Sequence, residues 1–413
     1  MKTKKTKLLF IISVCFLTFS NISFSSTRTC LERSISNLTL KNLPINHQLY
    51  QMYPDLKPSF IDKKVKAIKT PFMYYRSFVL QFYNTVLHSN KLKTPQKLKQ
   101  FQGHGLVDYH IDNFNILQEK KGVFRYTMND PDEGAIVPLY SDFLRYLTSL
   151  KLAPEYLTKS EYKQIIKAYK KGLSGEKPVL PDYIKEHLKK LPTTKFTTSE
   201  KSISKFRTLK KGRVLEELSV KEKKSFLKVL KQSFGNNAKI LDQIKFLNIT
   251  GGSGGLTRFR FIVKLPKSSP LLKKFNISRT QIFELKEIRV RVNPMSPKNG
   301  IKSSTQNTVM ALGKKQKTTP LNQVVKVNKT SYLLRPDFKG FKVEAASSLE
   351  GEEYFETVLA QAATIGNIHK RALLNQHSDY VKAIESVSET DWINDSKILS
   401  KEFRKQFSEL KDR

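Results

Sequence analysis

Hydrophobic residues recur with two different spacings along the chain, and the change divides it into two parts. In the first part, apolar side chains repeat every three or four positions, which is typical of helices with one buried face. This pattern predicts helices over residues 76–89, 140–152 and 160–173. A run of aromatic and β-branched residues at 123–128 predicts a strand between the first two helices.

The second part begins near residue 236 and changes to short β-branched and aromatic runs separated by turns, which predicts a sheet. These runs cover residues 244–247, 258–265, 282–292 and 332–335. A long helix is then expected over 352–373, and shorter helices over 379–387 and 396–410. Between the two parts, residues 175–212 are rich in Lys, Ser, Thr and Pro, which indicates a mobile connection or an exposed insert.

Together the two patterns predict an α+β protein with two lobes, and 413 residues are enough to build both cores. The expected divisions are a helical lobe (26–175), a basic connecting segment (176–235), a sheet lobe (236–345) and C-terminal helices that pack on the helical lobe (346–413).

The first residues have the features of a targeting segment. Lysines at positions 2, 4, 5 and 7 precede an apolar stretch, Leu8 to Phe19, that is too short to span a bilayer comfortably. Ser23 and Ser25 supply the small residues of a cleavage site. We therefore expect a signal peptide over residues 1–25 and export to the periplasm or the medium; an uncleaved, membrane-anchoring N-terminus is the alternative.

Cysteine content and charge exclude few functions for this chain. Cleavage would remove Cys15 and leave Cys30 alone, so no intramolecular disulfide is expected. The net charge is +38, or +34 without the four lysines of the signal segment. This charge would attract nucleotides, nucleic acid or an anionic membrane surface, although lysines spread over every surface explain it equally well. The sequence contains no recognisable nucleic-acid-binding module.

One segment brings together side chains suited to phosphoryl transfer. Asp108, His110 and Asn113 lie within six positions, so a carboxylate could orient an acceptor hydroxyl while an amide oxygen holds Mg²⁺. The spacing resembles the catalytic loop of aminoglycoside and choline kinases, H-G-D-x-H-x-x-N. Val107 stands where that motif usually has Gly.

Further acidic residues follow in the order that such a site needs. Asp130 and Asp132 could complete the magnesium site with Asn113, because Mg²⁺ prefers carboxylate and amide oxygens. Their segment resembles the D-F-D or D-F-G turn of these kinases, with Pro131 in place of the aromatic residue. Asp142 matches the aspartate that begins the next helix and supports the catalytic loop. Each acidic group taken alone is more typical of an exposed turn or a helix cap.

A glycine-rich segment and two basic residues are the candidates for nucleotide binding. Its residues are Gly251, Gly252, Ser253, Gly254 and Gly255. Backbone N–H groups can approach phosphates closely at glycine, although a flexible hairpin tip has the same composition. Lys286 resembles the V-A-I-K lysine that contacts the phosphates of ATP, and Arg335 is a second candidate. A lysine at a strand edge is the alternative for Lys286.

The chain order of these motifs indicates a circular permutation. Ile365 to His369 resembles the L-x-x-L-H signature that precedes the catalytic loop in aminoglycoside-type kinases, yet it lies near the C-terminus. Joining the ends restores the order of the kinase motifs. The resemblance therefore implies a bilobal protein-kinase-like fold in permuted order, with the helical catalytic lobe first and the nucleotide-binding lobe second. His369 itself fits a buried, hydrogen-bonded histidine better than a catalytic one.

The same motifs in this order resemble a family of unknown function, the domain-of-unknown-function family 2252. The matching segments are Thr70 to Arg76, Asp108 to Asn113, Asn129 to Glu133, Ser141 to Leu147, Gly251 to Gly255, Leu285 to Glu287, Tyr332 to Lys339 and His369 to Arg371. The family implies no reaction. Arg76 and Arg335 fall at matching positions, where phosphate contacts and structural ion pairs are both plausible roles.

Two functions follow from these comparisons. The first is a kinase-like phosphotransferase that uses ATP and Mg²⁺ to phosphorylate an unknown hydroxyl acceptor. The second is a catalytically inactive, pseudokinase-like basic protein that is exported and holds an anionic ligand or envelope polymer. The joint presence of Asp108, Asn113, Asp130, Asp132 and Lys286 favours the enzyme, whereas Val107, Pro131 and the expected export favour the binding protein.

Overall fold

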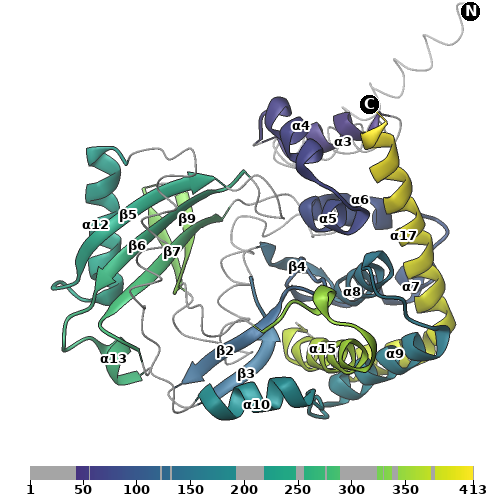
Figure 1. Cartoon of the computed structure of the whole chain (residues 1–413). Helices are drawn as coiled ribbons and strands as arrows, with labels where there is room; N and C mark the ends of the chain where they lie inside the picture. Colours follow the sequence, from purple (N-terminus) through teal and green to yellow (C-terminus); the bar gives the residue numbers. More distant parts are fainter. Residues whose placement is uncertain are drawn as a thin grey trace, which may run out of the picture. The chain divides into compact units, whose positions relative to one another are not determined.

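Helices dominate the computed structural model outside one five-stranded sheet (Figure 1). The structure describes residues 43–54, 56–120, 123–130, 133–191, 218–247, 255–274, 277–288, 323–328, 330–336, 343–373 and 377–412. The expected signal peptide, both cysteines, Asp132 and residues 251–254 of the glycine-rich segment lie outside these ranges.

The chain divides into two compact units, residues 1–54 and 55–413. The described part of the first unit is a single helix, α3 (Ile45–Met52), which follows Pro44. Among the helices of the described ranges, none has both the length and the apolar character needed to cross a bilayer.

The second unit begins with four short helices, α4 (Pro58–Ala67), α5 (Pro71–Ser77), α6 (Val79–His88) and α7 (Thr94–Leu98). A single helix over 76–89 was therefore the wrong prediction, because the chain breaks at Phe78, whose ψ is 69°. At this break the Ser77 carbonyl accepts a 2.8 Å hydrogen bond from the buried ammonium group of Lys64. The apolar period could not reveal this contact between two segments.

Two two-stranded sheets and two helices follow. Strand β1 (Gln102–Gly105) pairs with β4 (Ala135–Pro138), and β2 (Phe114–Lys120) pairs with β3 (Val123–Met128). Helix α8 (Tyr140–Leu152) and helix α9 (Lys159–Ser174) confirm the predicted helices at 140–152 and 160–173. A capping box of Thr158 and Glu161 fixes the start of α9.

Residues 176–235 contain more structure than a connection requires. Helix α10 (Asp182–Lys190) buries Ile184, and Tyr183 makes a 3.1 Å hydrogen bond with Thr357. Helix α12 (Val220–Phe234) starts at a second capping box, formed by Ser219 and Glu222. The prediction of an irregular segment is thus corrected over 182–190, while residues 192–217 lie outside the described ranges.

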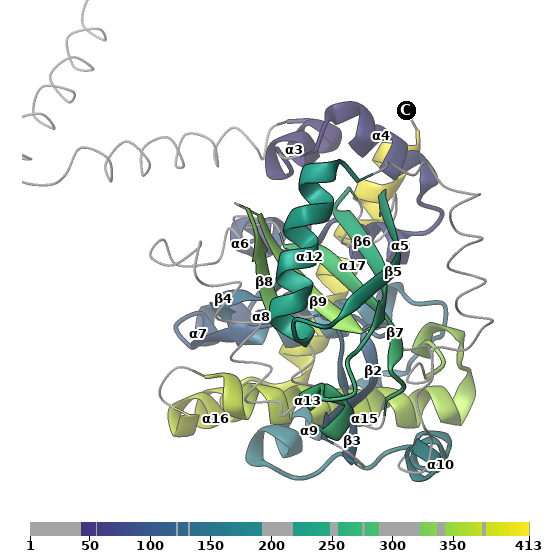
Figure 2. The same cartoon turned by 90° about the vertical axis from the view of Figure 1, so that its left-hand side faces the viewer.

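The expected sheet is present and wholly antiparallel. Strands β5 (Lys239–Leu247), β6 (Thr257–Lys264), β7 (Thr280–Ile288), β9 (Thr330–Pro336) and β8 (Gln323–Val327) lie in that spatial order, with the short helix α13 (Pro270–Lys274) between β6 and β7. Helix α12 covers one face, as both views show (Figures 1 and 2). Its Phe226 packs against Phe259 and Tyr332, and its Phe234 packs against Phe283.

The C-terminal segment returns to the helical part. It consists of the 3₁₀ turn η4 (Ala346–Ser348) and the helices α15 (Gly351–Ala372), α16 (His377–Ser386) and α17 (Glu389–Lys411). Helix α15 packs along α9, and α17 packs on α8 and α9, as expected for C-terminal helices that join the helical part (Figure 1). In this core Phe143 stacks on Tyr169, and Trp392 contacts both rings edge to face.

Two glycines set the close approach of α9 and α15. A Cβ on Gly172 would collide with the Ala363 carbonyl, and a Cβ on Gly366 would collide with the Tyr169 carbonyl. Glycine normally weakens a helix, by about 1 kcal/mol relative to alanine. Here it is required because backbone atoms, which cannot move aside like a flexible side chain, occupy the space.

We predict that Gly366→Ala lowers the free energy of unfolding by about 2 kcal/mol or more, since overpacking outweighs the gain in helix propensity. Chemical denaturation of the full chain measures this change. Glu356→Ala, on an exposed position of the same helix, should change stability by less than about 0.5 kcal/mol. An unchanged or raised stability of Gly366→Ala would contradict the packing described.

Candidate functional site

The residues expected to carry catalysis lie in one loop, residues 106–113, which runs from β1 to β2; we call it the Asp108 loop. The loop turns sharply at Val107, where φ is +68° and the Asp108 N–H donates a 2.7 Å hydrogen bond to the Leu106 carbonyl. A three-residue turn with positive φ is strained, and more so for a β-branched residue. The glycine of the related kinase motif would fit this conformation without strain.

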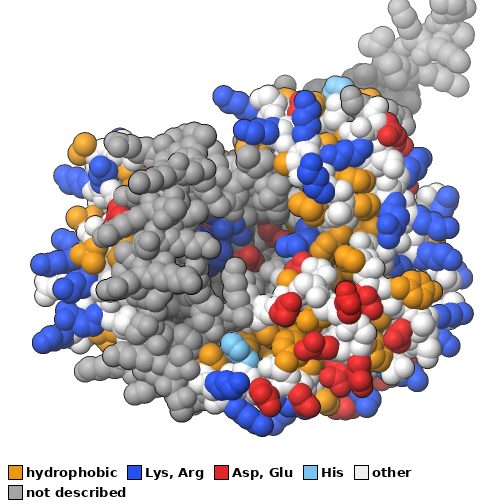
Figure 3. Space-filling view, in the orientation of Figure 1, with side chains coloured by type: hydrophobic (Ala, Val, Ile, Leu, Met, Phe, Trp, Pro, Cys, Tyr) orange, Lys and Arg blue, Asp and Glu red, His pale blue; other side chains and the backbone are white. Residues whose placement is uncertain are grey.

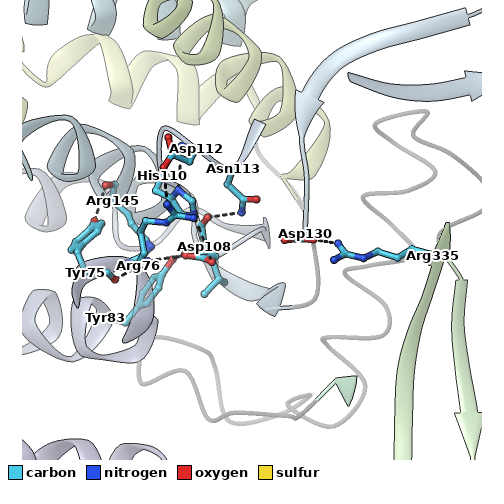
Figure 4. A network of polar contacts seen from close by, with 11 residues as sticks. Tyr75, Arg76, Tyr83, Asp108, His110, Asp112, Asn113, Asp130, Arg145 and Arg335 are labelled. Atoms are coloured by element: carbon cyan, nitrogen blue, oxygen red, sulfur yellow. Dashed lines mark hydrogen bonds and ion pairs between the residues drawn. The ribbon is translucent and has the colours of Figure 1, made fainter. Parts of the chain in front are cut away.

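Two side chains of α8, one helical turn apart, hold the loop in place. Asp142 is fully buried, and its carboxylate accepts hydrogen bonds from the Leu106 N–H at 2.9 Å and from the Tyr83 hydroxyl at 3.0 Å. Arg145, also fully buried, donates a hydrogen bond to Asp108 Oδ1 at 2.8 Å (Figure 4). The expectation that Asp142 supports the loop backbone is confirmed.

Arg145 remains charged in this buried position. Burial alone would lower its pKa, but Tyr75 and Asp108 outweigh that effect and raise the pKa above the ordinary value. The Tyr75 ring lies 4.3 Å from the guanidinium, and the Tyr75 hydroxyl donates to the Arg145 carbonyl. The carboxylate of Asp108 is therefore fixed in direction by a cation that cannot turn away.

His110 points toward Asp108 from within the loop. Its Nδ1 accepts a 3.2 Å hydrogen bond from the Asp112 N–H, and its Nε2 lies 3.9 Å from Asp108 Oδ2. Burial lowers the pKa of His110 well below the ordinary value, and the positive charges of Arg76 and Arg145 lower it further. The ring is therefore neutral at neutral pH and suited to orienting Asp108 rather than to carrying charge.

Arg76 belongs to a structural ion pair. Its Nη1 lies 2.6 Å from Asp112 Oδ2, which settles the choice between an ion pair and a phosphate contact in favour of the pair for this state. Asp112 also accepts hydrogen bonds from the N–H and the hydroxyl of Ser347, both at 3.0 Å. These bonds attach η4 to the end of the Asp108 loop.

Asn113 ends the loop and begins the β2–β3 hairpin. Its Nδ2 donates a 2.9 Å hydrogen bond to the Asp108 backbone carbonyl, which ties the Asn113 amide to the Asp108 loop. The Asn129 N–H donates to the Asn113 carbonyl at 2.9 Å and brings the end of β3 beside the loop. Asp130, the next residue, has φ +50°, a conformation that aspartate tolerates better than most residues.

Asp130 is bound by Arg335 of strand β9 through an ion pair between Oδ1 and Nη1 (Figure 4). The same guanidinium contacts Glu284 of strand β7, with Nη2 2.8 Å from Oε1. Arg335 thus joins the sheet to the turn that follows β3. Both family-related arginines, Arg76 and Arg335, make ion pairs with aspartates of the candidate site.

The sheet presents a charged face opposite the one that α12 covers. Lys286 is 97% buried on the third strand of the sheet. Among the residues of the glycine-rich segment, Gly255 alone falls within the described ranges, and its φ of +89° is favourable only for glycine. In Figure 3, basic and acidic side chains are visible in the recess between sheet and helices.

His369 has the structural role expected for it. The side chain is fully buried, its Nδ1 lies 2.9 Å from the Tyr169 hydroxyl, and its Nε2 lies 3.8 Å from Asp142. Its ring contacts Tyr109 of the Asp108 loop at a centroid distance of 5.8 Å. Helix α15 therefore lies directly beside the loop.

Comparison with protein families supports the expected similarity to family 2252. Residues 58–218 match the family described as "Uncharacterized protein conserved in bacteria (DUF2252)". This region of the chain is similar to the DUF2252 family. It contains the Asp108 loop, Asp130 and Asp142, whereas the segments from Gly251 onward remain resemblances. No curated protein and no solved structure matches the chain.

Sequence reasoning missed several residues of the DUF2252 region and of the sheet. Arg145, Asp112 and Glu284 were not among the candidates, yet each forms an ion pair with a candidate residue. Arg145 had a visible signal, because it is a charged residue on a helix whose neighbouring positions are apolar. No such signal marked Asp112, because its partners Arg76 and Ser347 come from distant segments.

Val107 offers a test of the strained turn in the DUF2252 region. We predict that Val107→Gly is more stable than Val107→Ala by about 1 kcal/mol, because only glycine relieves the positive φ, which costs about 1–3 kcal/mol in other residues. The control is Leu106, also buried but free of positive φ, where the alanine variant should be the more stable. Urea denaturation of the four variants measures both differences, and the same order at both positions would refute the strain.

His110 should make stability depend on pH. Its pKa is depressed in the folded state, so below about pH 6.5 the unfolded chain binds a proton that the folded chain does not. Between pH 6.5 and 5, the wild type should lose about 1–2 kcal/mol more unfolding free energy than His110→Asn, whose amide oxygen can replace Nδ1 as acceptor. Between pH 7 and 8 the two curves should run parallel. Parallel curves over the whole range would contradict a neutral buried His110.

Proposed function

We propose that the chain is a kinase-like phosphotransferase that moves a phosphoryl group from ATP to a hydroxyl acceptor. The observation that carries the proposal is that Asp108, Asn113 and Asp130 all lie at the root of one hairpin, where Asn113 is bonded to the Asp108 backbone and Asp130 is paired with Arg335 of the sheet. Phosphoryl transfer depends mainly on positioning and on charge stabilisation, and such a rigid set of groups can supply both.

Asp108 is the proposed base. Arg145 occupies Oδ1, so Oδ2 is the oxygen assigned to the acceptor hydroxyl, with His110 Nε2 close to it. A carboxylate fixed in this way can accept the hydroxyl proton as the acceptor oxygen attacks phosphorus. The strained turn at Val107 and the bond to Asp142 determine the direction in which Asp108 projects.

Asn113 and Asp130 are the residues proposed to hold magnesium. The Asn113 amide donates through Nδ2, which leaves Oδ1 directed away from the loop backbone. Amide and carboxylate oxygens are suitable magnesium ligands, and a magnesium ion bound there would neutralise charge on the phosphates. No cluster of three or more His, Cys, Asp or Glu side chains that could hold a metal occurs within the described ranges. The proposed set therefore needs the nucleotide phosphates, or Asp132, to complete it.

The permuted kinase-like architecture is part of the proposal. Helix α15 contacts the Asp108 loop through Tyr109 and His369, and Gln361 donates a 2.9 Å hydrogen bond to the Ile111 carbonyl. Lys286 lies on the third strand of the sheet, as the phosphate-binding lysine of protein kinases does. The contacts of α15 and the position of Lys286 support a kinase-like arrangement in which the sheet and α15, late in the chain, serve a catalytic loop that lies early in it.

A second candidate function rests on the pairing of Arg335 with Asp130. In that pair, Arg335 occupies the Asp130 carboxylate that magnesium would need. Such an arrangement fits a protein that has the fold of a kinase but no catalytic activity. In this reading the chain is an exported, pseudokinase-like basic protein that binds an anionic ligand, an envelope polymer or an anionic membrane surface. On the face shown in Figure 3, lysine and arginine side chains are spread widely, which offers no single binding patch.

Magnesium and ATP together should stabilise the wild type and raise its melting temperature. A ligand at one hundred times its Kd adds about 2.7 kcal/mol to the unfolding free energy. The shift should disappear in Asp130→Ala and persist in Asp182→Ala, an exposed aspartate of α10. Differential scanning fluorimetry at millimolar ATP measures it, and a wild type without any shift would exclude the nucleotide-dependent enzyme.

Catalysis can be separated from binding at Asp108. We predict that Asp108→Asn lowers magnesium-dependent release of ADP, with water as the acceptor, by about 100-fold or more, while ATP still binds. Asp182→Asn supplies the same chemical change at an exposed site. Equal ADP release by Asp108→Asn and the wild type would favour the inactive binding protein.

A further inference from the structure

One arginine beside the Asp108 loop is held in place and yet open to solvent. The side chain of Arg76, in the last turn of α5, is 34% exposed, whereas that of Arg145, which binds Asp108, is fully buried. Figure 4 shows Arg76 reaching from α5 toward His110 and Asp108. Among the described residues, Asp112 is the one hydrogen-bond partner of Arg76, and it uses Nη1. The N–H donors on Nη2 and Nε therefore remain for a ligand or for solvent.

Two contacts orient the guanidinium of Arg76. Its Nη1 lies 2.6 Å from Asp112 Oδ2, and its Cζ lies over the Phe72 ring, 5.4 Å from the ring centroid. Asp112 is itself fixed, because its carboxylate also accepts hydrogen bonds from the N–H and the hydroxyl of Ser347. A cation that is already oriented loses less side-chain entropy when it binds a ligand, so Arg76 is prepared for binding.

Contacts with His110 and Phe72 place Arg76 in the neighbourhood of the proposed base. Arg145 occupies Asp108 Oδ1, and His110 Nε2 lies 3.9 Å from Asp108 Oδ2. The Phe72 ring meets the His110 ring edge to face, at a centroid distance of 6.3 Å, and it also contacts the Arg76 guanidinium. The positive charge of Arg76 lowers the pKa of His110, second only to burial. Arg76 and Asp108 are therefore both neighbours of one imidazole ring.

The charged group that this region exposes most to solvent is a cation. The side chains of Asp108 and Asp112 are only 13% and 8% exposed, and each is paired with a guanidinium. His110 adds no charge, because it is neutral at neutral pH. Arg76 thus determines the charge that an arriving acceptor meets first. A negative group on the acceptor would be attracted to it, whereas a positive group would be repelled.

We propose that Arg76 binds an anionic group of the acceptor, so that the substrate is a hydroxyl compound with a carboxylate or a phosphate. Two N–H donors of one guanidinium can bind two oxygens of either anion. The acceptor would bridge Arg76 and Asp108, with its hydroxyl at Oδ2. The proposal rests on the proposed function, because Asp108 acts on an acceptor only if the chain transfers a phosphoryl group.

The transfer itself leaves Arg76 unchanged. The acceptor oxygen bonds to the γ-phosphorus of ATP, the bond from that phosphorus to the bridging oxygen of ADP breaks, and the hydroxyl proton passes to Asp108. Arg76 holds the acceptor by its anionic group, away from the reacting oxygen. Its contribution is therefore to acceptor affinity and orientation.

The test is ligand-observed NMR of the full chain with glycerate, glycerol 3-phosphate and glycerol as probes. It is done without nucleotide, in EDTA and at about 150 mM salt to limit nonspecific attraction. At least one of the two anions should bind about tenfold more tightly than neutral glycerol, and the tighter one identifies a carboxylate or a phosphate. Arg76→Gln should weaken its binding by about tenfold or more, as expected when a hydrogen bond to a charged group is lost. Arg404→Gln, the same change at an exposed arginine of α17, should have little effect.

Asp112→Asn separates ligand binding from a purely structural role of Arg76. It breaks the same ion pair from the other side but leaves the guanidinium, so it should bind the anion at least as tightly as the wild type does. Asp182→Asn, with the same change in net charge, should bind as the wild type does. Arg76→Lys can keep the pair with Asp112 but should bind the anion about threefold more weakly or worse, because an ammonium cannot present two parallel donors. Circular dichroism spectra and melting temperatures show whether each variant is folded.

Three results would overturn the proposal: no binding of either anion, equal weakening by Arg76→Gln and Arg404→Gln, or equal weakening by Arg76→Gln and Asp112→Asn. Other outcomes separate it from the proposed function. Anion binding that depends on Arg76, without any ADP release from magnesium-ATP, would support the anion site and exclude the phosphotransferase. ADP release that is lost in Asp108→Asn, without any anion binding, would support the phosphotransferase and refute an anionic acceptor.

Discussion

The whole candidate site depends on the buried contacts between helix α8 and the Asp108 loop. Arg145 and Asp142 lie one turn apart on α8 and bind the Asp108 carboxylate and the Leu106 N–H, respectively. A charge buried without its partner costs about 3–5 kcal/mol, so the loop cannot leave α8 without a large loss of stability. This constraint explains why a strained turn at Val107 persists and why Asp108 points in one direction.

The same constraint extends to both sides of the loop. Toward the C-terminal helices, Asp142 lies beside His369. His369 is hydrogen-bonded to the Tyr169 hydroxyl, which is in turn hydrogen-bonded to the Tyr380 hydroxyl. Toward the sheet, the hairpin that begins at Asn113 delivers Asp130 to Arg335. Early and late segments of the chain therefore meet at one loop, and the glycine contacts between α9 and α15 set the geometry of the C-terminal side.

The sequence predicted those elements whose periodicity is set by a single buried face. Helices α8, α9, α15 and α17 and most strands of the sheet belong to this class, because their apolar residues repeat regularly. It failed where a distant polar group decides the local structure. Lys64 bonds to the Ser77 carbonyl where helical geometry is interrupted at Phe78. Ile184 is buried on α10, in a segment whose composition indicated a mobile connection or an exposed insert.

The candidate site shows the same limit. Local spacing was enough to select Asp108, His110, Asn113 and Asp130, since these residues lie close together in sequence. The partners that were missed come from distant segments, since Arg145 lies 37 residues from Asp108 and Ser347 lies 235 residues from Asp112. A single sequence contains no record of such contacts. Arg258 and Arg260 of β6 both pair with Glu284 of β7, which is another contact that spacing along the chain does not reveal.

The most direct test of the account is a crystal structure of the full chain with magnesium and a non-hydrolysable ATP analogue. The account predicts magnesium bound by Asn113 Oδ1 and the Asp130 carboxylate, phosphates on Lys286 and Arg335, and the terminal phosphate facing Asp108 Oδ2. A nucleotide bound away from the Asp108 loop, with Arg335 still paired to Asp130, would contradict the claim that this loop is a phosphotransfer site.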